Sequence, residues 1–591
     1  MLPTSPYGSL PDALAQRIDS ALDRVRALLN GREPDRQLLI EVRDLLIDAV
    51  RTRDGFTLHN FPLDPRTRDA VYLLSEDPDQ RLALYLGMRD AALATPVHNH
   101  TTWACIVGVQ GCEQNRFFER GAGGLRETGS AEVVHGSGVA MMHDDLHSIA
   151  TDSGVLNMQL HLYGRSFEEQ AGRVMVDAAT GAERTFSGHP EVQIPHGRIT
   201  AAMLRRMIDD GRELAVLDLR SAVEHCEIGH PLVASSLPLD RLADELIRRV
   251  PSRAARIVLL DDDPERASQA MEVLARAGYS RPFCLAGGVK AWKDAGYALF
   301  DGMNVPGKAF GEHLETAGHI PMITAATLAA WRSSGKPFVL VDCRTEAEHR
   351  RMTIPGSINL PGPESLSRIH ALAPNREQPI VVHCAGRTRG LVATQTLIDA
   401  GCPNPVMALE NGLIGWLLAG QALEMAGGRP VPEAGATLPG PDPQVPQIDA
   451  ATLGDWVGDP TRTTYVFDVR SPQEFAAGHF PGAQLASGGE LVQQIDSWVP
   501  VRHARVVLVG DDARARAVAA LLSRMDWCEP ALLVGSFDAV SGAEPERPAI
   551  PRGWRPPFDE YEQDPVRMRG YIQWELSLLS KLADDGSLVF R

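Results

Sequence analysis

The sequence predicts a multidomain protein in which N-terminal helices and a β-barrel domain precede three α/β domains. Two observations support this. Short apolar strands separated by Gly and Asp turns follow one another from about residue 70, which is typical of a β-barrel or sandwich. A repeat of roughly 120 residues then alternates strands with helices, which indicates mainly parallel sheets.

The segment before the barrel is predicted to hold two amphipathic helices. Apolar residues recur at helical spacing from Leu14 to Leu46, and the sequence Gly-Arg-Glu-Pro at 31–34 interrupts them. The first strand of each repeat ends in Asp-x-Arg, at 215–220, 339–344 and 465–470. A glutamate stands four residues after each arginine: Glu224, Glu348 and Glu474.

The expected domain boundaries follow from these changes of pattern. The barrel domain occupies 1–195, and the three repeats occupy 196–302, 318–426 and 446–540. Pro/Gly-rich linkers lie at 427–447 and 544–557. Residues 541–591 combine the second linker with one amphipathic helix, expected at 571–586.

Composition excludes several classes of protein. The 76 acidic and 58 basic residues give a net charge of −18, which argues against a nucleic-acid partner. No apolar run reaches the ~18 residues of a membrane helix, and no secretory signal is visible. The eight cysteines are scattered without a CxxC pair, so we expect a reducing, cytoplasmic location.

A histidine pattern in the barrel domain indicates a metal site. His98 and His100 are two residues apart, so on a strand both imidazoles face the same side. Two neutral imidazoles can hold a first-row divalent metal. A third ligand would come from another strand, and His143, His147 and His161 are the candidates.

The motifs PVHNHTTWACIVGVQG, DDLHSI and HLYG together resemble the thiol dioxygenase (cysteine dioxygenase) family of cupins over roughly residues 10–190. The resemblance implies a cupin barrel with a ferrous ion, Fe(2+), held by His98, His100 and His147. It also implies that O2 and a small thiol are the substrates. We favour His147 over His143 because a ligand needs a barrel-facing strand position. Ala104 and Cys105 stand where most cupins have a ligating glutamate, which leaves a neutral ligand set.

The same resemblance assigns further residues. His161 and Tyr163 match the family's His-x-Tyr pair beside the iron, and Cys105 lies where some members cross-link a cysteine to that tyrosine. The residue that holds the substrate carboxylate, Arg or Gln in the family, aligns with Tyr72. The nearby alternatives are Arg66, Arg68, Arg81 and Arg89. With Tyr72 at that position, we expect cysteine to be a poor substrate.

The middle repeat carries a second candidate site in PIVVHCAGRTRG. Cys384 follows a buried strand and precedes a helix, which is where open α/β sheets place their sites. The helix dipole together with Arg387 and Arg389 should lower the thiol pKa and favour a nucleophilic thiolate.

This loop, with DCRTEAEH, IPGSINLP and NGLIGW, resembles the rhodanese sulfurtransferases. The resemblance implies a persulfide on Cys384 and an anionic donor held by Arg387. Gly386 and Thr388 would line the substrate site, and Arg389 would end the loop. Asp261 and Asp511 are aligned with Cys384 in the other repeats, so those rhodanese-like domains should be inactive.

The sequence therefore predicts a bifunctional enzyme of sulfur metabolism. An iron-dependent thiol dioxygenase would convert a small thiol to a sulfinate. A rhodanese of the thiosulfate or 3-mercaptopyruvate type would move sulfane sulfur from a donor to a thiol acceptor. The alternatives are a persulfide-oxidising fusion, or a non-catalytic cupin joined to a sulfur carrier or sensor.

Overall fold

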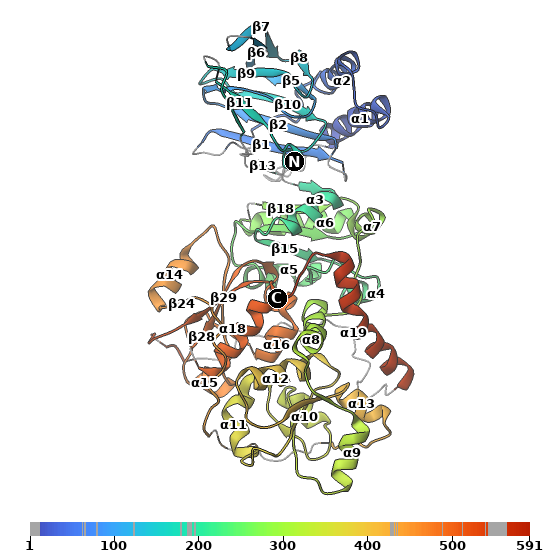
Figure 1. Cartoon of the computed structure of the whole chain (residues 1–591), viewed down its shortest axis with the longest axis vertical. Coiled ribbons are helices and arrows are strands. Elements are labelled where there is room, and N and C mark those ends of the chain that lie inside the picture. The colour runs from blue at the N-terminus through green and yellow to red at the C-terminus, as the bar shows by residue number, and fades with distance from the viewer. Residues whose placement is uncertain are drawn as a thin grey trace. The chain divides into compact units, whose positions relative to one another are not determined.

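The protein is represented by a computed structural model (Figure 1). It describes residues 12–591 except 59, 62, 64–66, 78–80, 122–123, 178–179, 186–191, 194–196, 280, 426–430, 432, 434, 487, 511, 538 and 542–563. The chain forms two compact units, Met1–Met203 and Leu204–Arg591. None of the described helices is both long and apolar enough to cross a membrane.

The N-terminal unit is β-rich and begins with two helices, as predicted. These are α1 (Asp12–Leu29) and α2 (Arg36–Ala49). One sheet has the order β13 (Val192–Gln193), β1 (Asp69–Glu76), β2 (Ala83–Arg89), β10 (Asn157–Tyr163), β5 (Ala104–Gln110), β8 (Gly138–Met141). The other has β12 (Glu183–Thr185), β11 (Val174–Val176), β4 (Val97–His98), β9 (Leu146–Thr151), β6 (Cys112–Gly121), β7 (Gly124–Val134), with β3 (Leu93–Ala94) on β9.

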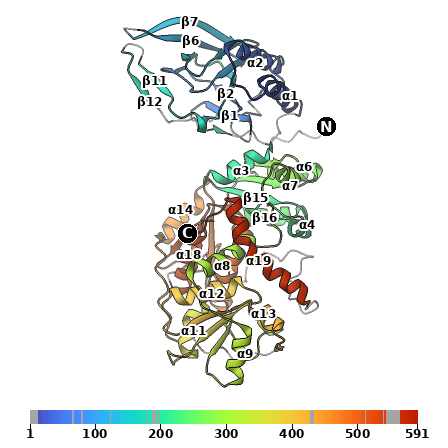
Figure 2. The same ribbon diagram turned by 45° about the vertical axis from the view of Figure 1, so that its right-hand side comes forward.

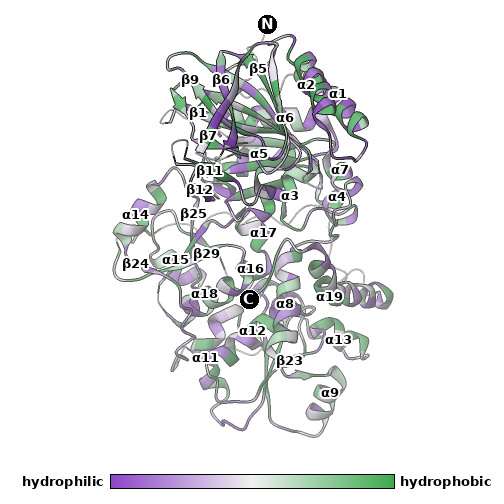
Figure 3. Cartoon of the chain, turned by 45° about the horizontal axis from the view of Figure 1, so that its top comes forward, coloured by the Kyte–Doolittle hydropathy of each residue, from purple (hydrophilic) through white to green (hydrophobic). Residues whose placement is uncertain are grey.

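The helices cover one face of the first sheet. Leu39 and Val42 of α2 belong to the same buried cluster as Leu86 and Leu160 of β2 and β10. Both helices are amphipathic, and Figure 3 shows hydrophilic and hydrophobic residues along each of them. Among the described strands the two sheets do not join into one closed barrel, so this part of the prediction is not confirmed.

The C-terminal unit contains three α/β domains. After β14 (Gly197–Ile199) in sequence, the first comprises α3 (Ala201–Asp209), β15 (Leu214–Asp218), α4 (Ala222–Glu227), β16 (Ala234–Ser236), α5 (Leu239–Arg249), β17 (Arg256–Leu260), α6 (Pro264–Arg276), β18 (Arg281–Leu285) and α7 (Gly288–Asp294). Its parallel strands run in the order β18-β17-β15-β16.

The middle domain follows α8 (Val305–Gly318). It comprises β19 (Met322–Ile323), α9 (Ala325–Ser333), β20 (Val339–Asp342), α10 (Glu346–Arg351), β21 (Ile358–Asn359), α11 (Ser365–Leu372), β22 (Ile380–His383), α12 (Thr388–Asp399), β23 (Val406–Leu409) and α13 (Gly412–Leu418). Its parallel sheet has the order β19-β23-β22-β20-β21, so β22 is a central strand.

The third domain repeats this order as β24-β29-β28-β25-β26. Its elements are β24 (Gln447–Ile448), α14 (Ala450–Gly458), β25 (Thr464–Asp468), α15 (Pro472–Ala477), β26 (Gln484–Leu485), α16 (Gly488–Gln493), α17 (Ile495–Trp498), β27 (Val501–Arg502), β28 (Arg505–Val509), α18 (Ala513–Met525) and β29 (Glu529–Leu533). Strand β27 pairs antiparallel with β15 of the first domain. The last helix, α19 (Pro565–Asp585), starts before the predicted 571, and the linker at 544–557 lies outside the described residues.

The repeated Asp-x-Arg motif forms an ion pair at the ends of β15, β20 and β25, buried in the first two domains and partly exposed at Arg470. In the middle domain, Nε and Nη2 of Arg344 donate to the two carboxylate oxygens of Asp342 at 3.0 and 2.7 Å. His349 Nδ1 and Thr353 Oγ1 also donate to Asp342, at 3.0 and 2.8 Å. The motif therefore fixes the strand end from which the neighbouring loops start.

The repeated glutamate caps the following helix. Thr345 Oγ1 accepts a hydrogen bond from the backbone N–H of Glu348, and Glu348 Oε2 accepts one from the backbone N–H of Thr345. The same capping box joins Ser221 to Glu224 and Ser471 to Glu474. The spacing seen in the sequence is therefore a helix-start signal as well as part of the site below.

Replacing Asp342 with Ala should strongly destabilise the C-terminal unit. The substitution leaves the Arg344 guanidinium, of which the side chain is 3% exposed, without its carboxylate. Breaking a buried pair in this way costs about 3–5 kcal/mol. Denaturant unfolding should report this loss. The Glu346→Ala control removes only an exposed partner of Arg350 and should change stability by about 0.5 kcal/mol or less. Equal effects of the two substitutions would contradict the assignment.

Candidate functional site

Cys384 lies directly after β22 and is only 3% exposed. The start of α13 holds this loop, since the backbone N–H groups of Leu413 and Ile414 donate to Cys384 O and Ala385 O, each at 3.0 Å. A Cβ on Gly412, whose φ is +49°, would lie 2.4 Å from Cys384 O. The NGLIGW motif thus supplies a helix start that the loop can approach closely.

Arg389 lies beside the thiol and is neutralised by Glu348. Its two terminal nitrogens donate to the two Glu348 oxygens, each at 2.7 Å. Burial raises the pKa of Cys384, and the Arg389 charge and the Gly390 N–H oppose that rise without reversing it. The predicted lowering of this pKa is therefore wrong for the structure as it stands, because desolvation outweighs the nearby charge.

Arg387 does not point its charge at a donor site. Its guanidinium donates to both oxygens of Glu312 at 2.7 and 2.8 Å, to Asn411 Oδ1 at 2.9 Å, and to Glu315. Because α8 supplies the two carboxylates, Arg387 ties the loop to this helix. The predicted donor-holding role is corrected to a positioning role.

The C-terminal helix α19 covers the loop, as its position beside α8 and α13 in Figure 2 suggests. Glu575 Oε1 accepts hydrogen bonds from Thr388 Oγ1 at 3.2 Å and from Tyr571 Oη at 3.0 Å. A Cβ on Gly386 would lie 3.2 Å from the Tyr571 ring and 3.3 Å from Glu575 Oε2. Gly386 and Thr388 therefore contact this helix, which the sequence indicated only as an amphipathic helix.

The other two domains carry no thiol at the equivalent position. Strand register pairs Asp342 with His383 and Asp218 with Leu260, so Asp261 corresponds to Cys384 in the first domain. Asp261 accepts hydrogen bonds from Arg266. In the third domain, Phe467 pairs with Leu508, which places Gly510 at this position. The alignment to Asp511, which lies outside the described residues, was one residue too far.

Three histidines of the N-terminal unit form a buried cluster. One ring nitrogen from each of His98, His100 and His147 lies within 4.8 Å of the others. The Nε2 atoms of His100 and His147 are 2.9 Å apart. Within the described residues, His100 Nδ1 is buried without a hydrogen-bond partner. The three predicted ligands thus lie together, although only His98 is in β4 and His100 follows that strand.

Neighbouring acceptors set the tautomers of two of these rings. His98 Nδ1 donates to Pro96 O at 3.0 Å, and His147 Nδ1 donates to Asn115 Oδ1 at 2.8 Å. The lone pair of each ring therefore lies on Nε2. Asn115 in turn donates to Glu113 at 2.9 Å, and burial raises the pKa of Glu113 to about 7. Such hydrogen bonds orient metal-binding imidazoles.

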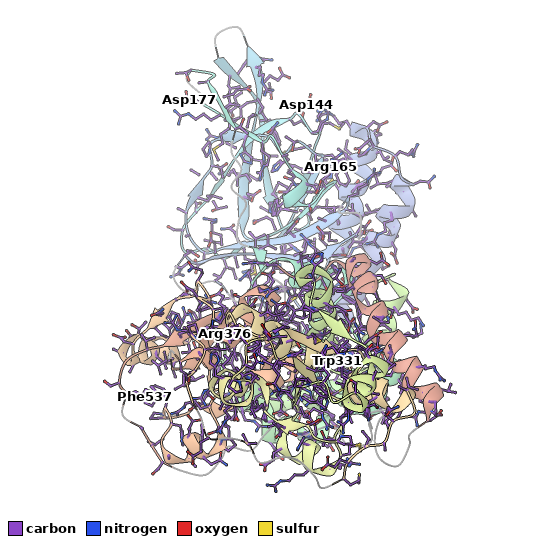
Figure 4. All side chains as sticks on the ribbon, turned by 60° about the horizontal axis from the view of Figure 1, so that its bottom comes forward. Asp144, Arg165, Asp177, Trp331, Arg376 and Phe537 are labelled. Atoms are coloured by element: carbon purple, nitrogen blue, oxygen red, sulfur yellow. The ribbon has the colours of Figure 1, made fainter. Side chains whose placement is uncertain are left out.

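His143 lies outside this cluster. Its side chain is 67% exposed and is 4.0 Å from Asp144, which is labelled in Figure 4 and is also exposed. The strand position of His147 in β9, where it pairs with His98 of β4, brings it to the cluster. This is the geometry on which we preferred His147.

His161 and Tyr163 lie next to the cluster, as the resemblance implied. Tyr163 Oη and His161 Nδ1 are 3.3 Å apart, and the ring centroids of His100 and Tyr163 are 5.1 Å apart. Burial raises the pKa of the Tyr163 phenol and lowers that of His161 to about 4. A protonated phenol and a neutral imidazole therefore face the site.

Two predicted site residues lie on the wrong face of the first sheet. Tyr72 pairs with Leu86 and packs with the helix-covered cluster, and Cys105 pairs with Leu162 of the same cluster. Cys105 Sγ lies 3.5 Å from Leu39 O. Successive strand residues face opposite sides, so neither residue shares the face of Tyr163. The structure contradicts both Tyr72 as a substrate ligand and the Cys105–Tyr163 cross-link.

The arginines named as alternatives do not fill the place of Tyr72. Arg68 and Arg89 pair with Asp90 and Asp69, and Arg81 is exposed. Arg66 lies outside the described residues.

A buried arginine that the sequence analysis missed lies close to the histidines. The Arg173 side chain donates from Nε to Asn99 O at 3.4 Å. Burial, followed by the Arg173 charge among other causes, lowers the pKa of His98 to about 4. The charge also acts on His100, His147 and Tyr163. No local pattern in the sequence marks Arg173, because its place near the histidines depends on the pairing of β11 with β4.

The comparisons with known proteins concern mainly the C-terminal unit. The Rhodanese-like domain family matches residues 200–295, 324–419 and 449–543. A thiosulfate sulfurtransferase from Pseudomonas aeruginosa is 30% identical, with a TM-score of 0.62. The similarity covers 67% of this chain and 99% of that structure.

Two further similarities are narrower. The 3-mercaptopyruvate sulfotransferase SseA from Escherichia coli is 19% identical, with a TM-score of 0.21, over 37% of this chain and 98% of that one. The HTH-type transcriptional regulator Rv0324 of Mycobacterium tuberculosis is 34% identical over 98 residues, which are 17% of this chain. The chain spans 42% of the length of that curated relative.

The family match and the similarity to the Pseudomonas aeruginosa structure identify the class of protein. The chain belongs to the rhodanese family and contains three rhodanese-like domains. A rhodanese-type sulfurtransferase function is supported for it, with the thiol in the middle domain.

The metal-free N-terminal unit should lose stability on mild acidification. The folded pKa of His98 is about 4 and its unfolded pKa is near 6.5, so the unfolded chain binds more protons between these values. Stability is full above about pH 6.5 and falls towards pH 4. Between about pH 7.5 and pH 5, His98 should contribute a loss of about 2 kcal/mol.

Denaturation midpoints of metal-free protein across this range measure the effect. His98→Gln should reduce the pH dependence of the denaturation midpoint. The exposed His143 provides the control, because His143→Gln should retain that pH dependence. A pH dependence unchanged by His98→Gln would contradict a neutral, buried His98.

Proposed function

We propose that this protein combines two sulfur chemistries, persulfide-mediated sulfur transfer at Cys384 and iron-dependent oxygenation of a small thiol in the N-terminal unit. The observation that carries the first is a thiol at the end of β22, beside Arg389, in a chain of the rhodanese family. The observation that carries the second is the buried cluster of His98, His100 and His147.

Sulfur transfer begins with the Cys384 thiolate attacking the sulfane sulfur of a donor such as thiosulfate. A new S–S bond forms on Cys384, the S–S bond of thiosulfate breaks, and sulfite leaves with the electron pair. An acceptor thiolate then takes the outer sulfur and restores Cys384. Arg389 favours the thiolate by its charge, while Glu348 holds the guanidinium in place.

Access to Cys384 requires the contact with α19 to open. The cysteine is 3% exposed, and Tyr571 and Glu575 lie against Gly386 and Thr388. Opening admits water as well as the donor. Because desolvation is the largest cause of the raised thiol pKa, opening also favours the thiolate.

The residues of the N-terminal unit fit a ferrous ion. The three imidazoles are neutral, two of them have Nε2 lone pairs fixed by Pro96 and Asn115, and His100 Nδ1 is left without a partner within the described residues. Neutral nitrogen donors suit first-row divalent metals. When bound, the iron would supply O2 activation and a direct attachment point for a thiolate.

The residues around the histidine cluster would orient the substrate and balance its charge. The Arg173 guanidinium would attract a thiol that carries an anionic group, which replaces the role given to Tyr72. The Tyr163 hydroxyl would donate a hydrogen bond towards the reacting sulfur or oxygen, and the His161 ring beside it would orient the phenol. With Arg173 near the site in place of Tyr72, cysteine is compatible with the charge of the pocket.

Covalent fusion would favour the use of one activity's product by the other. A thiol or persulfide released by one site meets the second site at a raised effective concentration. A small organic thiol is the simplest compound that both chemistries share.

Cys384→Ser should abolish sulfur transfer from thiosulfate to cyanide, because serine cannot carry a sulfane sulfur. Thiocyanate formation measures this activity. The matched control is Cys402→Ser in the same domain, which removes a partly exposed thiol remote from the loop and should leave the rate unchanged. Retained activity in Cys384→Ser, or its loss in Cys402→Ser, would overturn the assignment of the sulfur carrier.

His98→Ala and His100→Ala should each abolish iron retention and thiol-dependent oxygen uptake, because two imidazoles remain where three bound the metal. Metal analysis of the full chain after iron reconstitution measures the first effect directly. Thiocyanate formation should persist, since Cys384 lies in the other unit.

The exposed histidine provides the control for this set. His147→Ala should lose iron and His143→Ala should retain it. Full iron retention in His147→Ala, or loss in His143→Ala, would contradict the ligand assignment. An iron-free protein without oxygen uptake would favour a non-catalytic N-terminal unit.

A further inference from the structure

A second cysteine of the middle domain lies beside Cys384 on the neighbouring strand. Asp342, the last residue of β20, pairs with His383, the last residue of β22. Cys343 and Cys384 are the next residues on these parallel strands. The backbone N–H of Cys343 donates to His383 O at 3.0 Å, so the two backbone segments stay paired just beyond the strand ends.

The two thiols face the same side of the sheet. Cys343 shares one buried cluster with Val339 and Val341, and Cys384 shares it with Ile380 and Val382. The alternate residues of the two strands, Leu340 in β20 and Val381 in β22, belong to the cluster on the other face of the sheet. Paired strands lie about 4.8 Å apart, and disulfides join residues with Cα atoms roughly 4.4–6.8 Å apart. The backbone thus satisfies the main requirement for a disulfide.

The surroundings separate the roles of the two thiols. Cys343 is 4% exposed, and burial, together with the charge of Cys384, raises its pKa well above the ordinary value. It is therefore a poor competitor for a sulfur donor. A cavity of about 10 Å³ adjoins Cys343 and Arg389, so Cys343 is not packed against side chains on every side.

Only the middle of the three rhodanese-like domains has a cysteine at the Cys343 position, and it is also the domain that has Cys384. Leu219 follows Asp218 in the first domain and Val469 follows Asp468 in the third, in the position of Cys343. These domains have Asp261 and Gly510 in the position of Cys384. Valine therefore fits this strand position in the same fold, and a core role alone does not require a cysteine.

We propose that Cys343 is a resolving thiol that protects Cys384 as a reversible disulfide when a peroxide oxidises it. The proposal rests on the reactive Cys384 of the function proposed above. The Cys384 thiolate attacks hydrogen peroxide, an S–O bond forms, the O–O bond breaks and hydroxide leaves. The sulfur is oxidised by two electrons and the peroxide is reduced.

The second step closes the disulfide. Cys343 sulfur attacks the sulfur of the Cys384 sulfenic acid, so the S–S bond forms as the S–O bond breaks. The hydroxyl group leaves as water with the proton of Cys343. An external dithiol reverses the reaction, whereas a sulfenic acid without a resolving thiol proceeds to irreversible sulfinic acid.

Peptide mapping under non-reducing conditions tests this on the full chain treated with hydrogen peroxide. We expect a linked pair of tryptic peptides, one ending at Arg344 and one at Arg387, that separates on reduction. This readout is independent of sulfur transfer. A disulfide formed in a protein without sulfurtransferase activity would contradict only the proposed function. An active enzyme that forms no such disulfide would contradict the resolving role of Cys343.

A variant series gives the functional readout. After peroxide and then dithiothreitol, the parent and the Cys402→Ser control should recover most of their thiocyanate-forming activity. Cys343→Val, which copies Val469, should start with parental activity but recover less than about a tenth of it, with sulfinic acid on Cys384. Recovery equal to the parent would contradict the proposal. Cys343→Ser serves as the second variant, and the parental peptide map decides the matter if neither folds.

Discussion

The C-terminal unit depends on a balance of charge around one sulfur at the end of a buried strand. Cys384 is nearly inaccessible, and the Arg389 charge that would stabilise its thiolate is itself buried. Glu348 makes this possible, because it caps α10 and binds Arg389 through both oxygens. The same glutamate thus fixes a helix start and prevents an unpaired buried cation. Arg387, Glu312 and Glu315 repeat this arrangement on the α8 side.

The three rhodanese-like domains share ion pairs around the loop although only the middle one has the cysteine. Each keeps the Asp-x-Arg pair and the capping glutamate, and in the third domain Glu474 still binds Arg514 through both oxygens. The first domain replaces the sulfur with Asp261, which pairs with Arg266. An aspartate thus supplies permanently the negative charge that a thiolate would carry. In the first domain, the loss of the thiol is therefore accompanied by a replacement of its charge, whereas the third domain has the uncharged Gly510 at this position.

Sequence patterns predicted the secondary-structure elements and the candidate sites better than they predicted which face of a sheet a residue lies on. The helix periodicity from Leu14 to Leu46 and the parallel α/β repeats were confirmed as local structure. His98 and His100 lie in one cluster, although only His98 is in a strand. Tyr72 failed because ungapped alignment cannot fix strand register, and one residue of slip reverses the face. Contacts that join distant segments, such as those of Arg173 or of Glu575 with Thr388, leave no local signal.

The chain should carry its transferable sulfur on one cysteine, held in a loop whose charges are already paired. Mass analysis of the protein after thiosulfate treatment tests this most directly, peptide by peptide. We expect one added sulfur atom per chain, on the peptide that contains Cys384, and its removal by cyanide. Sulfur added to the peptides of Cys343 or Cys402, or no added sulfur on any peptide, would contradict it.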